Sequence, residues 1–168
     1  GCCYADVYDN LGNIVIGKKC SFCRTPDHTT DKEVIKRLKK RMEVGDEHAF
    51  LIMGGLHERG NCGLPQDSVK AIEFWHKAGR DGYATIGSAY SNGEGVERDE
   101  KMTKHYYELA AMEGDITARY NLGVKEYNAG NFDRALKHFI IAVRGGHTKA
   151  SNVILKMYMN GHATKDHY

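Results

Sequence analysis

The strongest constraint on the fold is an internal repeat with a constant interval between equivalent positions. Five positions recur three times each in the same register: Asp67, Asp99 and Asn131; Ala71, Thr103 and Ala135; Trp75, Tyr107 and Phe139; Ala78, Ala110 and Ala142; Gly82, Gly114 and Gly146. A fixed period of about 30 residues is typical of solenoids, because each unit can bury its apolar face only against its neighbours.

Within each unit the spacing predicts a helix. The small residue, the aromatic residue and the alanine follow one another at i, i+4 and i+7, which is one face of a helix. The Asp or Asn four residues earlier is expected to be the N-cap, and the glycine after the last turn is expected to adopt positive φ. The aromatic residues at this position are therefore expected in the core, not on a nucleic-acid stacking platform. We expect Tyr106, with Phe74 and His138 in equivalent places, to line part of an exposed surface.

A second ladder of small residues lies between these helices and predicts a second helix in each unit. Its members are Gly45, Ala49 and Gly54; Gly114, Ala118 and Gly123; Gly146, Ala150 and Leu155. Gly60, Gly93 and Gly161 are expected to form the turns into the next helix. The sequence thus predicts an all-α fold, an α/α solenoid of antiparallel helix hairpins.

The second unit departs from the pattern. Gly82 and Gly87 are 5 residues apart, whereas Gly114 and Gly123 are 9 apart. Four residues correspond to about 400° of rotation, close to one helical turn. The helix that follows Gly82 is therefore expected to keep its buried face and to be one turn short.

An amphipathic capping helix is expected over 31–44. Thr30 and Glu33 have the spacing of a capping box. Its apolar residues are Val34, Ile35, Leu38 and Met42. The basic residues between 36 and 41 are interpreted as a solvated face, with a nuclear-localisation signal as the alternative.

Composition excludes several classes of protein. The 168 residues include 19 Gly but only 2 Pro, which excludes collagen and Pro/Gly-rich disorder. A net charge of +2 argues against a nucleic-acid-binding protein. No apolar run has the length that a bilayer requires, so no membrane span is expected. Nine histidines include no H-E-x-x-H pattern, and we expect them to be structural or exposed. No catalytic residue is predicted.

The cysteines gather at the start of the chain. Four of the five, Cys2, Cys3, Cys20 and Cys23, lie in the first 23 residues. The C-x-x-C pair favours a zinc knuckle in a reducing compartment over a disulfide scaffold, with a redox or incidental pair as the open alternative. The expected location is the cytoplasm, with the nucleus as the alternative. The chain starts with Gly and is expected to be a fragment.

The repeats resemble the SEL-like repeat (SLR) family. The residues that carry this resemblance are 84–99, ATIGSAYSNGEGVERD, together with Asp67–Ala71, Ala110–Gly114 and Ala118–Gly123. The tyrosine of the family pattern is replaced by His57 in the first unit and Glu126 in the third. This resemblance implies a scaffold that binds partner proteins, although it does not name the partner-binding residues.

The N-terminal stretch resembles the last part of a RING-type zinc finger. The matching residues are Cys2 and then Cys20-Ser-Phe-Cys23 followed by Arg24. The resemblance implies that Cys2 belongs to one zinc and that Cys20 and Cys23 belong to another. It also implies that Arg24 contacts a ubiquitin-conjugating enzyme and its ubiquitin. Neither zinc reaches four ligands within this chain, so the finger is expected to be incomplete.

These observations predict two parts: a finger remnant over 1–28 and a solenoid over 29–168. The solenoid is divided into the capping helix 31–44, repeats at about 46–80, 82–113 and 115–145, and a partial repeat over 147–168. The first functional hypothesis is an SLR scaffold that recruits substrates for a RING-type ubiquitin ligase, with the fragment itself inactive. The alternative is a non-catalytic adaptor with a purely structural zinc knuckle.

Overall fold

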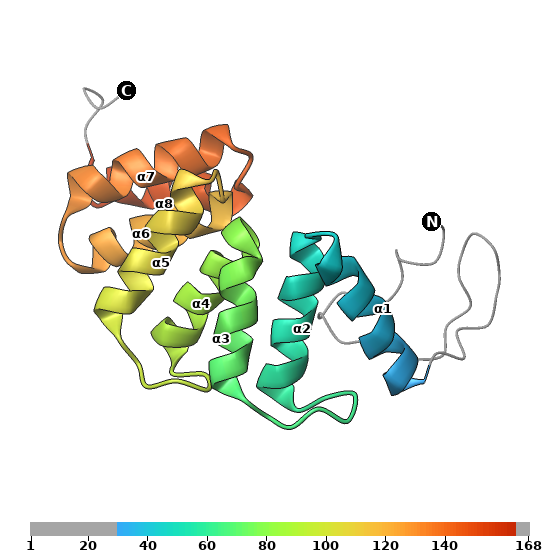
Figure 1. Ribbon diagram of the computed structural model, residues 1–168. Helices are drawn as coiled ribbons and strands as arrows, with labels where there is room; N and C mark the ends of the chain where they lie inside the picture. Colours follow the sequence, from blue (N-terminus) through green and yellow to red (C-terminus); the bar gives the residue numbers. More distant parts are fainter. Residues whose placement is uncertain (1–29, 164–168) are drawn as a thin grey trace.

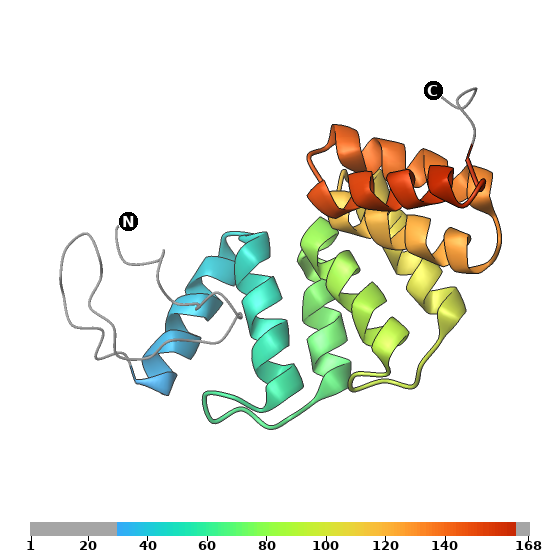
Figure 2. The ribbon, with the colours of Figure 1, turned by 180° about the vertical axis from the view of Figure 1, so that it is seen from behind.

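The computed structural model describes residues 30–163, and all regular structure in this range is helical. The helices are α1 (Asp31–Glu43), α2 (Glu47–Arg59), α3 (Ser68–Lys77), α4 (Gly79–Asn92), α5 (Glu100–Met112), α6 (Ile116–Asn128), α7 (Phe132–Arg144) and α8 (Thr148–Met159). Each helix packs against the next one in the chain, and α1 and α8 lie at opposite ends of the stack (Figure 1 and, from behind, Figure 2). The predicted α/α solenoid is confirmed.

The aromatic position of the repeat meets the glycine of the small-residue ladder where two helices pack. Trp75, Tyr107 and Phe139 are all buried, as predicted. Each lies against one glycine of the preceding helix: Gly54, Gly87 and Gly123 respectively. A Cβ atom at Gly87 would be 2.7 Å from Cδ1 of Tyr107, and one at Gly123 would be 2.7 Å from Cε1 of Phe139. The glycines are therefore required by close approach of an aromatic ring.

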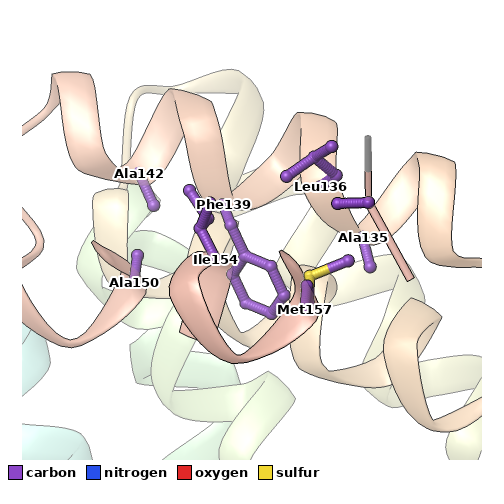
Figure 3. Close-up of a cluster of buried hydrophobic side chains, with 8 residues drawn as sticks. Ala135, Leu136, Phe139, Ala142, Ala150, Ile154 and Met157 are labelled. Carbon is purple, nitrogen blue, oxygen red and sulfur yellow. The ribbon is translucent and has the colours of Figure 1, made fainter. Parts of the chain in front are cut away.

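The contact between α7 and α8 shows how the stack is filled. Ala135, Leu136, Phe139 and Ala142 of α7 form one buried cluster with Ala150, Ile154 and Met157 of α8 (Figure 3). Ala142 and Ala150 point toward each other, so the two backbones come close at this end of the pair. Leu155 takes the place of the ladder glycine in α8 and is 60% exposed.

The predicted N-cap positions are confirmed at Asp67, Asp99 and Asn131, but the predicted side-chain cap bond forms only at Asp67 and Asp99. The carboxylate of Asp67 accepts from the amide of Lys70 at 3.0 Å, and that of Asp99 accepts from Met102 at 3.0 Å. The side chain of Asn131 makes no cap hydrogen bond to α7. Its Nδ2 donates instead to Oε2 of Glu126 at 2.8 Å, because this buried carboxylate needs donors.

The prediction of a short helix after Gly82 is wrong. α4 has 14 residues, and the shortened helix is α3, with 10 residues against 13 in α5 and α7. The left-handed glycine after α3 is Gly79, with φ of 61°. Gly82 lies inside α4, where an added Cβ atom would collide with the carbonyl group of Trp75. The shortening of the second unit therefore falls at the end of α3 and the α3–α4 junction. The contact between the ring of Tyr107 and Gly87 is kept.

The predicted capping helix is confirmed as α1. The hydroxyl of Thr30 accepts from the amide of Glu33 at 3.4 Å. Leu38 is buried, and the other apolar residues of this face, Val34, Ile35 and Met42, pack around it. The basic residues Lys36, Arg37, Lys39 and Lys40 are exposed, and Arg41 is half-buried.

Candidate interaction groove between α2 and α4

A surface groove of about 380 Å³ lies between α2 and α4. Its apolar lining comes from Leu51, Ile52, Trp75 and Ala89. Gly55, Thr85 and Ser88 complete the walls, and His48, Glu58, Arg59 and Glu94 also line it. We call this hollow the groove.

The polar groups in the middle of the groove are already bonded inside the protein. The indole nitrogen of Trp75 donates to the carbonyl of Leu51 at 3.2 Å. The hydroxyl of Thr85 donates to the carbonyl of Asp81 at 2.8 Å. The hydroxyl of Ser88 donates to the carbonyl of Ala84 at 3.1 Å. A ligand would therefore meet mainly carbon atoms in the middle of the groove, and apolar contact would supply its binding energy.

A second hollow of about 620 Å³, which we call the notch, adjoins the groove at the loop end of the helices. It is lined by Gly45, Asp46, Glu47, His48, Leu51, Ala78, Arg80, Asp81 and Glu113. Ala78 lies at the short α3–α4 junction, where a single residue separates the two helices. The α3–α4 junction, where the second unit departs from the repeat, therefore forms one wall of the notch.

Carboxylates dominate the charge of the notch. Arg41 forms an ion pair with Asp46 at 2.7 Å, and Arg80 forms one with Asp81 at 3.0 Å. Among the residues that the structure describes, neither Glu47 nor Glu113 has an ion-pair partner. The notch is therefore negative.

A polar cluster around the buried Glu126 joins α5, α6 and α7. Oε1 of Glu126 accepts from Nζ of Lys104 at 2.9 Å. This hydrogen bond lowers the pKa of Glu126, and the bond from Asn131 lowers it further, against the opposing effect of burial. Burial lowers the pKa of His138, whose Nδ1 is buried and has no hydrogen-bond partner within the described part of the chain. Since every other member is bonded within the fold, the cluster is interpreted as structural.

The prediction that Tyr106 lines an exposed surface is wrong. Tyr106 is only 7% exposed, and its ring stacks on that of Tyr90 with 5.9 Å between centroids. Its hydroxyl shares a hydrogen bond of 3.0 Å with Nε2 of His76, and burial raises its pKa. The equivalent Phe74 is half-buried and stacks on His57.

The predicted zinc ligands Cys2, Cys20 and Cys23, and the predicted contact residue Arg24, lie outside the described residues. Within 30–163, no group of three or more His, Cys, Asp or Glu could hold a metal ion. Cys62, the cysteine of this range, is half-buried, and burial together with Asp31 raises the pKa of its thiol. None of the helices described has the length and apolar character needed to cross a bilayer.

Sequence reasoning did not identify the residues of the groove and the notch. The 5-residue interval from Gly82 to Gly87 signalled an irregularity at this place. It did not show which helix loses residues, and so it did not reveal a hollow.

The stacked helix pairs and their surface groove define a helical-repeat protein of the solenoid class. The Sel1 repeat family model matches residues 51–83, 85–115 and 116–147, together more than half of the chain. The chain belongs to the Sel1 repeat family, as the resemblance implied. The resemblance to a RING-type finger lies outside the matched residues.

Known proteins support this assignment. The chain is 30% identical over 109 residues to the "ERAD-associated E3 ubiquitin-protein ligase component HRD3B" of Arabidopsis thaliana, covering 64% of this chain and 18% of that protein. It is 26% identical over 121 residues to "Chitin synthase regulatory factor 4" of Schizosaccharomyces pombe, covering 69% of this chain and 19% of the relative. The chain thus spans about a fifth of the length of these relatives.

Solved structures show the same fold. A Sel1 repeat protein from Oxalobacter formigenes superposes with a TM-score of 0.69 at 30% identity, over 80% of this chain and 58% of that one. The antigen c5321 of uropathogenic Escherichia coli, which has an SLR fold, gives a TM-score of 0.70 at 24% identity, over 84% of this chain and 32% of that one.

Proposed function

We propose that this chain is a protein–protein interaction scaffold that holds a partner in the groove between α2 and α4. The observation that carries the proposal is an open groove whose middle is apolar and whose central polar groups, those of Trp75 and Thr85, are bonded internally. Membership of the Sel1 repeat family supports it, because solenoids present extended binding surfaces.

Site-specific photo-cross-linking tests this proposal. A photoreactive residue at Thr85, inside the groove, is expected to capture the partner, whereas the same residue at the exposed Glu73 on α3 is not. Gly55→Leu should abolish the capture at residue 85, because the leucine side chain fills the groove. The variant is expected to fold, because leucine is a better helix former than glycine. Equal capture from both positions, or capture unaffected by Gly55→Leu, would contradict the proposal.

We further propose that residues 1–28 are part of a RING-type finger, through which the scaffold recruits substrates to a ubiquitin ligase. The C-x-x-C pair followed by Arg24 supports this. So does the name of the Arabidopsis relative, a ubiquitin-ligase component, although that name concerns that protein alone. The thiolates of Cys2, Cys20 and Cys23 are suitable zinc ligands, and the reducing cytoplasm is the proposed location.

Two measurements separate the ligase from its alternative, an adaptor with a structural zinc knuckle. Zinc titration of the full-length protein is expected to show binding that Cys20→Ser and Cys23→Ser weaken. In the full-length protein, Arg24→Ala is expected to reduce ubiquitin transfer without releasing zinc. Zinc binding without any transfer would favour the adaptor, and no zinc binding would contradict both hypotheses.

A further inference from the structure

We infer that the groove and the notch together bind one peptide segment of a partner, with an apolar centre and a basic residue on each side. This inference rests on the proposed function, since it specifies the chemistry of the ligand that the groove accepts.

The two hollows form one continuous surface. His48 and Leu51 line both of them. Both residues lie on α2, which contributes Glu47 to the notch and Glu58 to the far end of the groove. A segment bound along α2 would therefore pass from the notch into the groove.

The middle of this surface is apolar and its two ends are acidic. Leu51, Ile52 and Ala89 provide the centre. At the notch end, Glu47 and Glu113 carry no ion pair among the described residues.

At the far end, the ion-pair partner of Glu58 among residues 30–163 is its neighbour Arg59, at 3.6 Å. Glu94 accepts from the side-chain amide of Asn92 at 3.0 Å and, within the described part of the chain, forms no ion pair. Each end therefore keeps an excess of negative charge, although the whole chain carries a net charge of +2.

Charge complementarity then selects the occupant. An acidic segment would place carboxylates against Glu47, Glu113 and Glu94 and would be repelled at both ends. A segment with Lys or Arg at its flanks would bring opposite charges together while its apolar centre displaces water from Leu51 and Ile52.

The length of the surface sets the spacing of the basic residues. Glu47 and Glu58 lie on one helix, so about 16 Å separates them along the axis at a rise of about 1.5 Å per residue. An extended segment spans this distance with about five residues at about 3.3 Å each. We therefore expect two basic residues about five positions apart, with apolar residues between them.

Selection from a displayed library of random short peptides tests the inference directly. The selected peptides are expected to show this pattern, and their binding is expected to disappear in Gly55→Leu. Glu47→Gln combined with Glu113→Gln should weaken binding by about three- to tenfold. The matched control, Glu73→Gln combined with Glu97→Gln, removes the same charge at two exposed positions outside both hollows and should leave affinity unchanged.

The outcomes distinguish this inference from the proposed function. If the selected peptides lack basic residues but lose binding in Gly55→Leu, the groove is a docking site and our account of its charge is overturned. Equal loss in the control variant would also overturn it. If no selected peptide depends on Gly55, the groove is not a docking site and the proposed function fails with the inference.

Circular dichroism and thermal unfolding establish that each variant is folded, and Thr85→Trp is a second variant that fills the groove.

Discussion

The ring of Tyr107 approaches Gly87 so closely that a Cβ atom added at residue 87 would lie 2.7 Å from Cδ1 of the ring. The hydroxyl of the same tyrosine shares a hydrogen bond of 3.1 Å with Ser88, so the ring is held in place at its far end. The relationship recurs between Gly54 and Trp75 and between Gly123 and Phe139. In the pairs α2–α3, α4–α5 and α6–α7, this contact limits how closely the two helices approach each other.

The substitution Gly87→Ala should therefore destabilise the solenoid. We expect the free energy of unfolding to fall by about 1–3 kcal/mol, because the ring of Tyr107 must shift to admit the methyl group. Gly55→Ala is the matched control on α2. Its new Cβ atom would meet only the flexible side chain of Arg59, at 3.1 Å, so the higher helix propensity of alanine should stabilise it by up to about 1 kcal/mol. Urea unfolding of the two variants measures both effects, and a stabilised Gly87→Ala would contradict the close-packing account.

Asn131→Asp should destabilise the protein, although Asp is as good an N-cap as Asn. The Nδ2 of Asn131 donates to the carboxylate of Glu126 at 2.8 Å, and an Asp would bring a second carboxylate there. We expect a loss of about 1–2 kcal/mol at neutral pH. In a Glu126→Gln background the loss should disappear, and a double-mutant cycle measures this coupling. Equal effects in the two backgrounds would show that Asn131 acts without Glu126.

Glu126 should contribute to the acid sensitivity of the fold. Its pKa is lowered below the ordinary value of 4.5, chiefly by the hydrogen bond from Lys104. A lowered folded-state pKa stabilises the protein above the ordinary value, and this contribution is lost as pH falls through the lowered value. Glu126→Gln should therefore be less stable than wild type at neutral pH, and the two should converge below pH 4.5. Urea unfolding across this range is the measurement. The exposed Glu108→Gln is the control, since it also lies within 4.0 Å of Lys104. A difference that persists unchanged at low pH would argue against this role.

His138→Phe should remove a source of pH dependence near neutrality. Burial holds the pKa of His138 below its ordinary value of 6.5, so the folded state favours the neutral ring. Stability should decline as pH falls from 6.5 toward the lowered folded-state value, because the unfolded chain takes up the proton first. Phenylalanine suits the position, since Phe74 occupies the equivalent place in the first unit.

Thermal unfolding on both sides of pH 6.5 is the measurement. The unfolding temperature should vary less with pH in His138→Phe than in wild type or in the exposed control His48→Gln. An unchanged profile would mean that His138 does not titrate with unfolding.

Most of the fold could be predicted from the sequence because its signals are local and periodic. The helices, the caps at Asp67 and Asp99, and the buried aromatic positions all follow from spacings within a single repeat unit. The ladder glycines were also identified, but as positions that permit close packing. The structure adds which ring each glycine meets.

Two of the predictions that failed share one physical cause. Asn131 lies at the N-cap position, yet its side-chain amide donates to Glu126 and makes no cap bond, since a buried carboxylate oxygen left without a donor costs more than a missing cap bond. Gly82 has the spacing of a C-terminal glycine, yet Gly79 takes the positive φ. In both cases an interaction between helices outweighs a preference of the local sequence.

The sequence by itself determined that this chain is a solenoid of helix hairpins, because a constant repeat period specifies how each helix pair must bury its apolar face. The motif residues of 84–99 carried the resemblance to the Sel1 repeat family. The sequence also specified the segment of 1–28 on which the zinc and ubiquitin proposals depend. Only the tertiary structure decided that α3 is the shortened helix and that a notch opens beside it. The same packing aligns an apolar groove with acidic ends along α2. Such a surface is made by residues of α2, α3 and α4 and of several connecting loops, and its shape depends on how closely these helices approach, which no local pattern encodes.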